Sequence, residues 1–330
     1  MKTRTIGAAQ VSALGIGAMS FSDFYGKTTE AESHAILDRA RAVGVSHIDT
    51  SNIYGAGRSE TVIGSWLAAN PGARASVHIA TKAGISSDGQ GNRIIDNSPA
   101  YMEAQLDASL QRLGTDHVDL FYAHRYQPDL PPEEVAGTLG RLVEKGKARA
   151  IGFSEIAPAT LRRAAAEHPV AAVQSEYSLQ TRAPELGLIQ ACAELGTALV
   201  AFSPVGRSLL TDDPIPRARI DANPFLSVNP RFTRPNHDFN LAALAPLREF
   251  AAQMGLSTAA LAVAWGLHKG VHVVSIPGTR SLAHFEELLA GANADLSAQD
   301  MARIEQILPV GWCHGDRYAP HQWVGPQNYC

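Results

Sequence analysis

The sequence of 330 residues is poor in cysteine, with only three: Cys192, Cys313 and Cys330. An odd number of cysteines, none at the spacing of metal ligands, argues against a disulfide framework, and a reducing, cytoplasmic setting is expected. The chain also lacks an apolar run of about 18 residues, so no membrane span is expected. Glycines interrupt the first twenty residues where a signal peptide would have its apolar core, so we expect no signal peptide.

The sequence has no excess of either charge, with 28 Lys and Arg against 32 Asp and Glu and a net charge of −4. That balance gives no electrostatic reason to expect a nucleic acid or an anionic membrane as partner. Because 45% of the residues are hydrophobic, the chain can bury a sizeable core, which excludes general disorder.

Eight short β-rich runs alternate with helical stretches along the chain. Most are nearly continuous apolar runs, which is typical of parallel strands covered on both faces. The helical stretch 98–114 begins with Ser98–Pro99 and ends at Gly114, the expected order of cap, first-turn proline and terminal glycine. The predicted strands are 14–20, 45–51, 77–84, 117–124, 148–155, 170–178, 197–206 and 271–279.

Eight strand–helix units without a break in composition predict an α/β fold, a (β/α)₈ TIM barrel formed as one domain by residues 1–330 with its core at about 3–309. A doubly wound sheet is the alternative, but "GIGAMS" holds only the first two glycines of the turn that it requires. Residues 206–240 predict a long irregular loop after the seventh strand. The irregular tail, 310–330, carries Trp312, Tyr318, Trp323 and Tyr329, and we expect it to pack on the body.

Polar residues stand at the ends of three successive predicted strands. Asp49 ends the second, with Tyr54 just beyond it, the third holds Lys82 and the fourth ends in His124. In such a barrel these strand ends converge on one mouth. An ammonium beside a phenol lowers the phenol's pKa from its usual value near 10, so these residue types suit a proton-donating tyrosine that polarises a carbonyl group while a hydride donor attacks its carbon.

Each of these residues also has an ordinary interpretation. Asp49 could be a turn residue, Tyr54 a partly buried loop aromatic and His124 a core histidine. A lysine in an apolar strand is stranger, because lysine is rarely buried without a partner. Their placement at successive strand ends favours the joint interpretation.

Several longer stretches are distinctive: "IDTSNIYGAGRSE", "IATKAG", "SLQRLGTDHVDLFYAHRYQP", "GKARAIGFSE", "AAVQSEYSL", "FSPVGRSLL" and "SIPGTRSLAHFEEL". In these stretches the chain resembles the aldo-keto reductases from about residue 3 to residue 309. The resemblance implies a (β/α)₈ barrel, reversible reduction of a small aldehyde or ketone with NADPH, and a catalytic tetrad of Asp49, Tyr54, Lys82 and His124. In this tetrad Tyr54 would be the acid in reduction and the base in alcohol oxidation.

The resemblance also implies a cofactor site. Ser154 and Gln174 would hold the nicotinamide carboxamide, and a helix N-terminus beside a guanidinium suits a 2′-phosphate, which favours NADPH although NADH is possible. The implied cofactor residues are Ser154, Gln174, Ser203, Pro204, Val205, Gly206, Gly278, Thr279, Arg280, His284 and Glu287, with Arg231 as a weaker candidate. The residues expected to line the substrate pocket are Met19, Phe21, Phe24 and Tyr25.

Two positions depart from the family pattern. Glu155 stands where many relatives have Asn, so the nicotinamide amide would be held through its NH₂ group alone. Leu288 follows Glu287 where Asn is common, which would remove one hydrogen bond to the adenine.

Two other functions are weighed against the reductase. One is a regulatory subunit that binds the nicotinamide cofactor as a redox sensor, since fold does not fix function. The other is a metal-dependent barrel hydrolase, which the 12 histidines suggest only weakly because no strand carries an H-x-H pair, and we expect no metal. The sequence does not indicate an oligomeric state.

Overall fold

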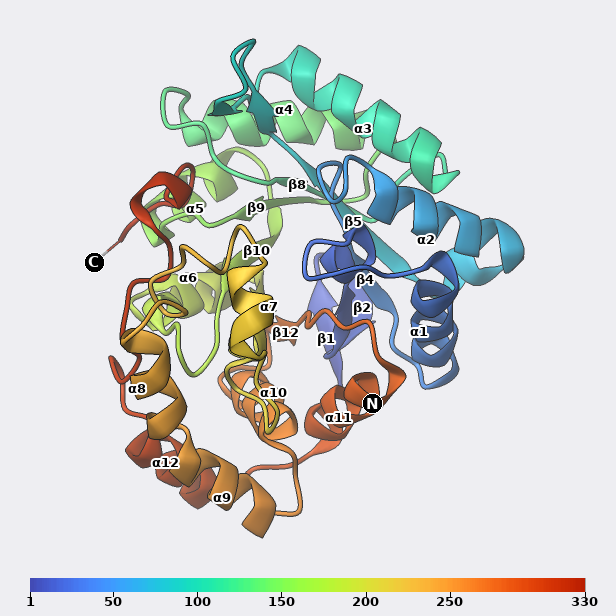
Figure 1. Cartoon of the computed structure of the whole chain (residues 1–330). Coiled ribbons are helices and arrows are strands. Elements are labelled where there is room, and N and C mark those ends of the chain that lie inside the picture. The colour runs from blue at the N-terminus through green and yellow to red at the C-terminus, as the bar shows by residue number, and fades with distance from the viewer. Residues whose placement is uncertain (330) are drawn as a thin grey trace.

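The computed structural model describes residues 1–329, so Cys330 lies outside the described residues. Eight parallel strands follow one another around a barrel, and every predicted strand is confirmed (Figure 1). The first and last strands meet at a parallel bridge between Leu14 and Ser275. The strands are β3 (Gly15–Gly17), β4 (His47–Asp49), β5 (His78–Ala83), β8 (Leu120–Ala123), β9 (Ile151–Ser154), β10 (Val170–Glu176), β11 (Ala198–Phe202) and β12 (Val273–Ser275).

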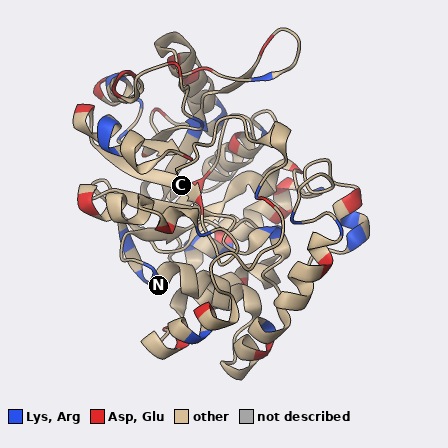
Figure 2. Ribbon diagram, turned by 90° about the vertical axis from the view of Figure 1, so that its left-hand side faces the viewer, with Lys and Arg blue, Asp and Glu red and all other residues tan. Residues whose placement is uncertain are grey.

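A helix follows each barrel strand and covers the outside of the sheet (Figure 1). The local signals explain several boundaries: Thr29 and Glu32 form a capping box at the first helix, and Gly114 takes a left-handed φ of 65° just after the third. These helices are α1 (Glu30–Ala42), α2 (Arg58–Ala69), α3 (Pro99–Leu113), α4 (Pro132–Glu144), α5 (Pro158–Glu167), α6 (Leu188–Leu195), α10 (Thr258–His268) and α11 (Leu282–Asn293). Figure 2 shows both signs of charge spread over the surface helices and loops, as the near-neutral composition predicts.

Side chains of alternating strand residues fill the barrel interior. Tyr122 is fully buried there, and Gly152 leaves room for its ring, since a Cβ at Gly152 would lie 2.5 Å from it. An N-terminal hairpin of β1 (Thr3–Ile6) and β2 (Ala9–Ser12) adds Ile6 and Val11 to the same apolar cluster. This hairpin was not predicted, because its two four-residue strands lack a clear pattern of apolar residues.

Two excursions from the barrel rim shape the mouth. A hairpin of β6 (Ile85–Ser87) and β7 (Arg93–Ile95) follows β5, and it was not predicted. The predicted irregular segment 206–240 contains the short helix α7 (Arg217–Asp221) and the start of α8 (Asn236–Ala243). Outside the barrel lie α9 (Ala245–Gln253) and α12 (Ala298–Ile307).

Within residues 1–329, no single helix has the length and hydropathy of a membrane span, and segments 236–253 and 258–268 reach them only as a pair bent by 87°.

The C-terminal tail packs on the body, as predicted. The Trp312 indole donates to the Leu179 carbonyl at 2.8 Å, and Arg317 forms an ion pair with Glu155 at the end of β9. The aromatic rings of Tyr318 and Trp323 both lie against the Arg317 guanidinium. The tail is therefore fixed by one buried cation and the aromatics around it.

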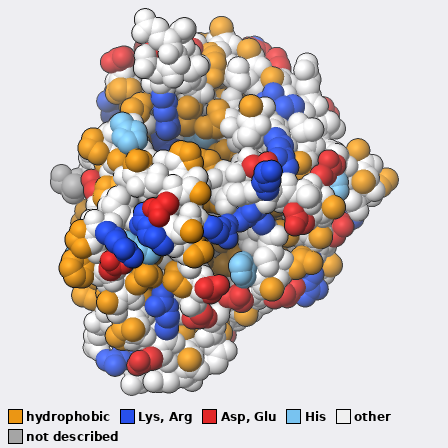
Figure 3. Space-filling model, in the orientation of Figure 1, with side chains coloured by type: hydrophobic (Ala, Val, Ile, Leu, Met, Phe, Trp, Pro, Cys, Tyr) orange, Lys and Arg blue, Asp and Glu red, His pale blue; other side chains and the backbone are white. Residues whose placement is uncertain are grey.

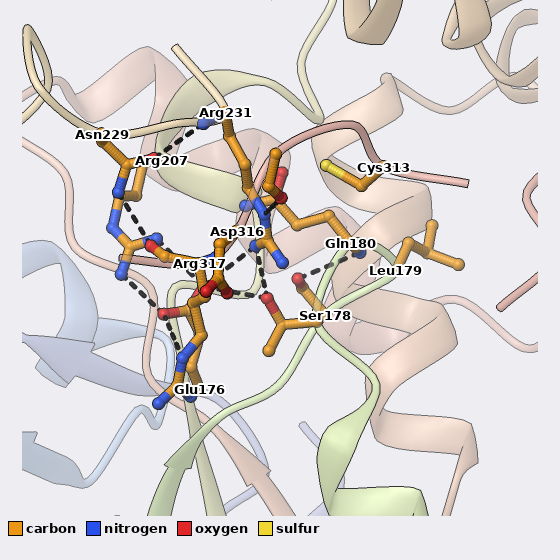
Figure 4. Close-up of polar contacts among 12 residues, drawn as sticks. Glu176, Ser178, Leu179, Gln180, Arg207, Asn229, Arg231, Cys313, Asp316 and Arg317 are labelled. Carbon is orange, nitrogen blue, oxygen red and sulfur yellow. Dashed lines mark hydrogen bonds and ion pairs between the residues drawn. The ribbon is translucent and has the colours of Figure 1, made fainter. Parts of the chain in front are cut away.

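A buried cluster of charges joins this tail to the barrel. Figure 4 shows Arg207, Arg231 and Arg317 converging on Glu176, the last residue of β10. Two nitrogens of Arg207 donate to its carboxylate at 3.0 and 2.6 Å, and Arg231 lies 3.6 Å away. Burial by itself would raise the pKa of Glu176, but the three guanidinium groups outweigh it and lower this pKa to about 2.

We expect Glu176→Gln to lower the melting temperature at pH 7 by roughly 5–10 °C, because Arg207 and Arg231 lose their counter-charge and Arg317 keeps only Glu155. Because the pKa of Glu176 is lower in the folded than in the unfolded chain, its carboxylate stabilises the fold fully above about pH 4.5, and this stabilisation is lost as the pH falls toward 2. Thermal melts followed by fluorescence should therefore show the gap between wild type and variant closing over that range. Glu249→Gln, at an exposed site on α9, is the matched control; a gap that is equal for both variants, or constant with pH, would contradict the assignment.

Candidate active site

The barrel brings Asp49, Tyr54, Lys82 and His124 together at the carboxyl ends of its strands. Strands β4, β5 and β8 are hydrogen-bonded neighbours, so residues at their ends are adjacent although they lie far apart in the sequence. The Lys82 Nζ donates to the Asp49 carboxylate at 2.5 Å and to the Tyr54 hydroxyl at 3.4 Å. The rings of Tyr54 and His124 meet edge to face, with centroids 5.8 Å apart. The predicted constellation is present as a contiguous group.

The Lys82 side chain is completely buried, with an exposed fraction of 0%. Burial disfavours its ammonium form, but Asp49 and the Tyr54 hydroxyl outweigh this effect and raise the pKa of Lys82. A further donation from Nζ to the Thr50 carbonyl, at 2.6 Å, fixes the side chain. Lys82 is therefore a charged, immobile neighbour of Tyr54.

The direction of the Tyr54 pKa differs from the sequence-based prediction. Lys82 does lower this pKa, as expected, but burial of the phenol is the larger influence and raises the pKa above its usual value of 10.0. Asp49 adds to the increase. Tyr54 is thus fully protonated at neutral pH, in the form that can donate a proton.

His124 lies just beyond β8, and its imidazole is neutral. Burial lowers its pKa well below 6.5, and the nearby charges of Arg125, Lys82 and Arg93 lower it further. Its Nδ1 lies 3.0 Å from the hydroxyl of Ser51, a buried residue that the sequence analysis missed. The hydroxyl has one proton and two acceptors in reach, Nδ1 and the Lys82 carbonyl at 3.2 Å. When it donates to Nδ1, the imidazole proton stays on Nε2 and can be donated to a substrate oxygen.

A cavity of about 1000 Å³ opens at this end of the barrel. Figure 3 shows the corresponding face hollowed, with Lys and Arg side chains around the recess. Asp49, Tyr54 and His124 line the cavity, whereas Lys82 lies buried beneath it. The other predicted residues in its wall are Met19, Phe24, Tyr25, Ser154, Gln174, Ser203, Pro204, Val205, Gly278, Thr279, Arg280, His284 and Glu287.

The wall fits a nicotinamide at one end. Gln174 donates from Nε2 to the Asp49 carboxylate at 2.7 Å, which leaves its carbonyl oxygen for another donor. The Ser154 hydroxyl accepts from Arg125 at 3.1 Å. Two polar side chains at the ends of apolar strands can thus bind an amide that offers both a donor and an acceptor.

The other end of the wall fits a phosphate. Helix α11 begins there with Ser281, whose hydroxyl accepts the backbone N–H of His284 at 3.4 Å. Arg280 stands before this cap, and burial together with the neighbouring Arg219 lowers its pKa. Lys27 and Arg219 line the same cavity. A helix N-terminus surrounded by cations suits the 2′-phosphate that distinguishes NADPH from NADH.

Besides Lys82, three predicted residues do not line the cavity. Phe21 is fully buried in the core, with an exposed fraction of 0%. Arg231 turns to Thr181, to which it donates at 2.6 Å, and to Glu176. Gly206 has a φ of 58° and lies against Gln180, since a Cβ there would come within 2.7 Å of that side chain, so its glycine serves packing rather than close approach to a pyrophosphate.

Glu155 does not face the site of the nicotinamide amide, where the family resemblance had placed it. Its carboxylate accepts from the Glu176 backbone N–H at 2.7 Å and pairs with Arg317. The side chain is thus held within the tail-anchoring cluster and is absent from the cavity wall. Leu288 does line the cavity, as its place after Glu287 suggested.

Several cavity residues were not foreseen: Phe202, Arg219, Arg93, Arg125, Tyr318 and Gln322. Phe202 ends β11 and Arg125 directly follows His124, so the strand-end rule that identified the tetrad could have found both. Arg93 comes from the hairpin and Tyr318 and Gln322 from the tail, where no pattern in the sequence gives their position. Within residues 1–329, no three His, Cys, Asp or Glu side chains gather as a metal site.

Comparison with known proteins agrees with this geometry. The profile of the Aldo/keto reductase family matches residues 13–309. An aldo-keto reductase of Schizosaccharomyces pombe, whose name specifies NADP(+), is 35% identical over 322 residues, covering 96% of this chain and 94% of its own. A probable aldo-keto reductase of Glycine max is 36% identical over 310 residues, covering 94% of this chain and 89% of its own.

Solved structures give the same result. A glycerol dehydrogenase of Gluconobacter oxydans superposes with a TM-score of 0.81 at 26% identity, covering 93% of this chain and 94% of its own. A thermostable aldo-keto reductase, solved with the inhibitor epalrestat, gives a TM-score of 0.71 at 26% identity, covering 93% of this chain and all of its own. The chain belongs to the aldo/keto reductase family of NADP-dependent oxidoreductases.

Proposed function

We propose that this protein reduces an aldehyde or ketone to the alcohol with Tyr54 as the proton donor. One observation carries the proposal: a protonated phenol faces the cavity between a buried ammonium and a neutral imidazole. NADPH, when bound, supplies the hydride to the carbonyl carbon. The protein's own task is to hold the carbonyl oxygen, to donate the proton and to stabilise the phenolate that remains.

The tetrad residues divide this task. Tyr54 and His124 both line the cavity with their rings edge to face, so one carbonyl oxygen can accept from the phenol and from an Nε2–H of the imidazole. The ammonium of Lys82 stabilises the phenolate once the proton has left, and Asp49 keeps that ammonium charged and in place. Gln174 holds the second oxygen of Asp49 at 2.7 Å, which prevents the carboxylate from rotating toward Tyr54.

Tyr54→Phe should lower kcat at least about 100-fold, since general acid catalysis typically contributes a factor of this size or more. NADPH binding, measured by fluorescence titration, should change less than about threefold because the phenol is not needed to hold the cofactor. Tyr101→Phe on α3 removes a phenol from outside the cavity and is the control. If the Tyr54→Phe variant turned over at the wild-type rate, Tyr54 would not be the proton donor. If the wild type bound NADPH but reduced no carbonyl compound, a redox-sensing function would be supported instead.

Ser51→Ala should lower kcat by about threefold to tenfold, because His124 loses the partner that keeps its proton on Nε2. Nitrogen NMR of the imidazole distinguishes the two neutral tautomers, and we expect Nε2–H in the wild type and a mixture in the variant. An unchanged tautomer together with an unchanged kcat would show that Ser51 has no such role.

Arg280→Ala should weaken NADPH binding by about tenfold to 100-fold, since a charge-assisted contact to the 2′-phosphate is lost. NADH lacks that phosphate, so its affinity should change less than about threefold, which calorimetry can measure. Arg41→Ala, at an exposed site on α1, is the matched control. Equal losses for both cofactors would place the 2′-phosphate elsewhere.

A further inference from the structure

Two guanidinium groups that have no carboxylate within 4.0 Å among residues 1–329 line the same cavity as Tyr54 and His124. Arg125 directly follows His124 and donates to its carbonyl at 2.6 Å, and Arg93 lies in β7 of the rim hairpin. An anion in this cavity can therefore reach cations on the same wall that carries the reacting groups.

Arg125 is a buried cation that lacks an acid. Only 8% of the residue is exposed, and its stem lies against Gly325 of the tail, where a Cβ would come within 2.7 Å. One nitrogen, Nη1, donates to the His124 carbonyl at 2.6 Å and to the Ser154 hydroxyl at 3.1 Å. The Nε is buried without a partner among the described residues. A buried donor left in this way costs free energy unless a ligand completes it.

Elsewhere the chain compensates the arginines that it buries. Arg207 is paired with Glu176 and Arg317 with Glu155, both through close contacts with a carboxylate. In the part of the chain that the structure describes, neither Arg93 nor Arg125 has a carboxylate within 4.0 Å. Five acidic residues line the cavity, and three of them have other partners: Asp49 pairs with Lys82, Asp212 accepts from Thr258, and Glu32 belongs to the cap of α1. The other two, Asp213 and Glu287, form no ion pair with Arg93 or Arg125.

Arg93 and Arg125 also repel each other. Burial and the charge of Arg125 lower the pKa of Arg93 from 12.5 to about 10. Both cations line one cavity with no anion beside them, and an incoming anion would lower the free energy of the buried Arg125 in particular. The 2′-phosphate of the cofactor has other cations, because Arg280, Arg219 and Lys27 line the cavity near the start of α11.

We propose that the carbonyl substrate carries a carboxylate, which Arg93 and Arg125 bind while Tyr54 and His124 hold the carbonyl oxygen. This inference rests on the proposed reductase function and narrows its substrate class to carbonyl acids. A carboxylate suits the planar fork of a guanidinium, which binds it through two parallel hydrogen bonds. Nη1 of Arg125 is already used, but Nη2 makes no hydrogen bond among the described residues and is not enclosed as Nε is, so it is a donor for such a bond.

The test compares 4-carboxybenzaldehyde with methyl 4-formylbenzoate, which have the same shape around the ring. The ester withdraws electrons more strongly than the carboxylate, so the neutral aldehyde is intrinsically the easier one to reduce. A kcat/KM for the acid that exceeds that for the ester by about tenfold or more is the expected result, and it would run against this intrinsic order. 4-Formylbenzenesulfonate, with a non-planar anion, distinguishes carboxylate recognition from simple charge attraction.

Arg93→Leu should reduce the acid-to-ester ratio of kcat/KM at least about tenfold, because one of the two cations is gone. This variant keeps the apolar bulk at the cavity mouth, and Arg93 is not buried, so folding is not at stake. Arg303→Leu on α12 removes an arginine at an exposed site and should leave the ratio unchanged. A wild type that prefers the ester, or an Arg93→Leu variant with the wild-type ratio, would overturn the proposal.

The failure of this inference and that of the proposed function remain distinguishable. Turnover of the ester without preference for the acid would refute the anion site alone. If neither aldehyde is reduced, the reductase function fails, and calorimetric titration of both aldehydes into the NADPH complex then tests the anion site by itself. Equal dissociation constants for acid and ester would refute it, whereas tighter binding of the acid that Arg93→Leu abolishes would support it.

Discussion

The rest of the site depends on the buried ion pair between Lys82 and Asp49. An ammonium taken out of water costs several kcal/mol unless a partner and further hydrogen bonds compensate it. Here Asp49 and the Thr50 carbonyl supply that compensation, and Gln174 in turn fixes Asp49. Lys82, Asp49 and Gln174 come from three strands, β5, β4 and β10, so the supported ion pair forms only when both parts of the barrel are assembled, and the charge beside Tyr54 depends on the tertiary fold.

The strand ends could be predicted from the sequence, and the rim could not. A nearly continuous apolar run has one physical interpretation in a barrel, so the eight strands, and with them Asp49, Lys82 and His124, follow from local pattern. Arg93 and Tyr318 reach the cavity through a short hairpin and an irregular tail. Their positions are set by contacts far along the chain, such as Arg317 with Glu155, and no local period encodes such contacts.

Buried positive charge is treated in three different ways in this molecule. Lys82 has one carboxylate and a phenol, and Arg207, Arg231 and Arg317 share two glutamates in a structural cluster. Arg125 is also buried, yet neither it nor the exposed Arg93 has a carboxylate within 4.0 Å among the described residues, although the same wall carries carboxylates. Since the chain neutralises its other buried cations, Arg125 is the exception and points to a ligand.

The raised pKa of Tyr54 determines what Lys82 has to do in the reaction. Burial disfavours the phenolate and keeps the phenol protonated in the resting site, where it can donate to a carbonyl oxygen. The same burial disfavours the phenolate that remains once the proton has left, so a raised pKa also makes Tyr54 a weaker acid. The ammonium of Lys82, whose Nζ lies 3.4 Å from the hydroxyl, stabilises the phenolate and offsets this cost. The charge that Asp49 maintains on Lys82 is therefore needed at the moment of proton transfer, whichever way the proton moves.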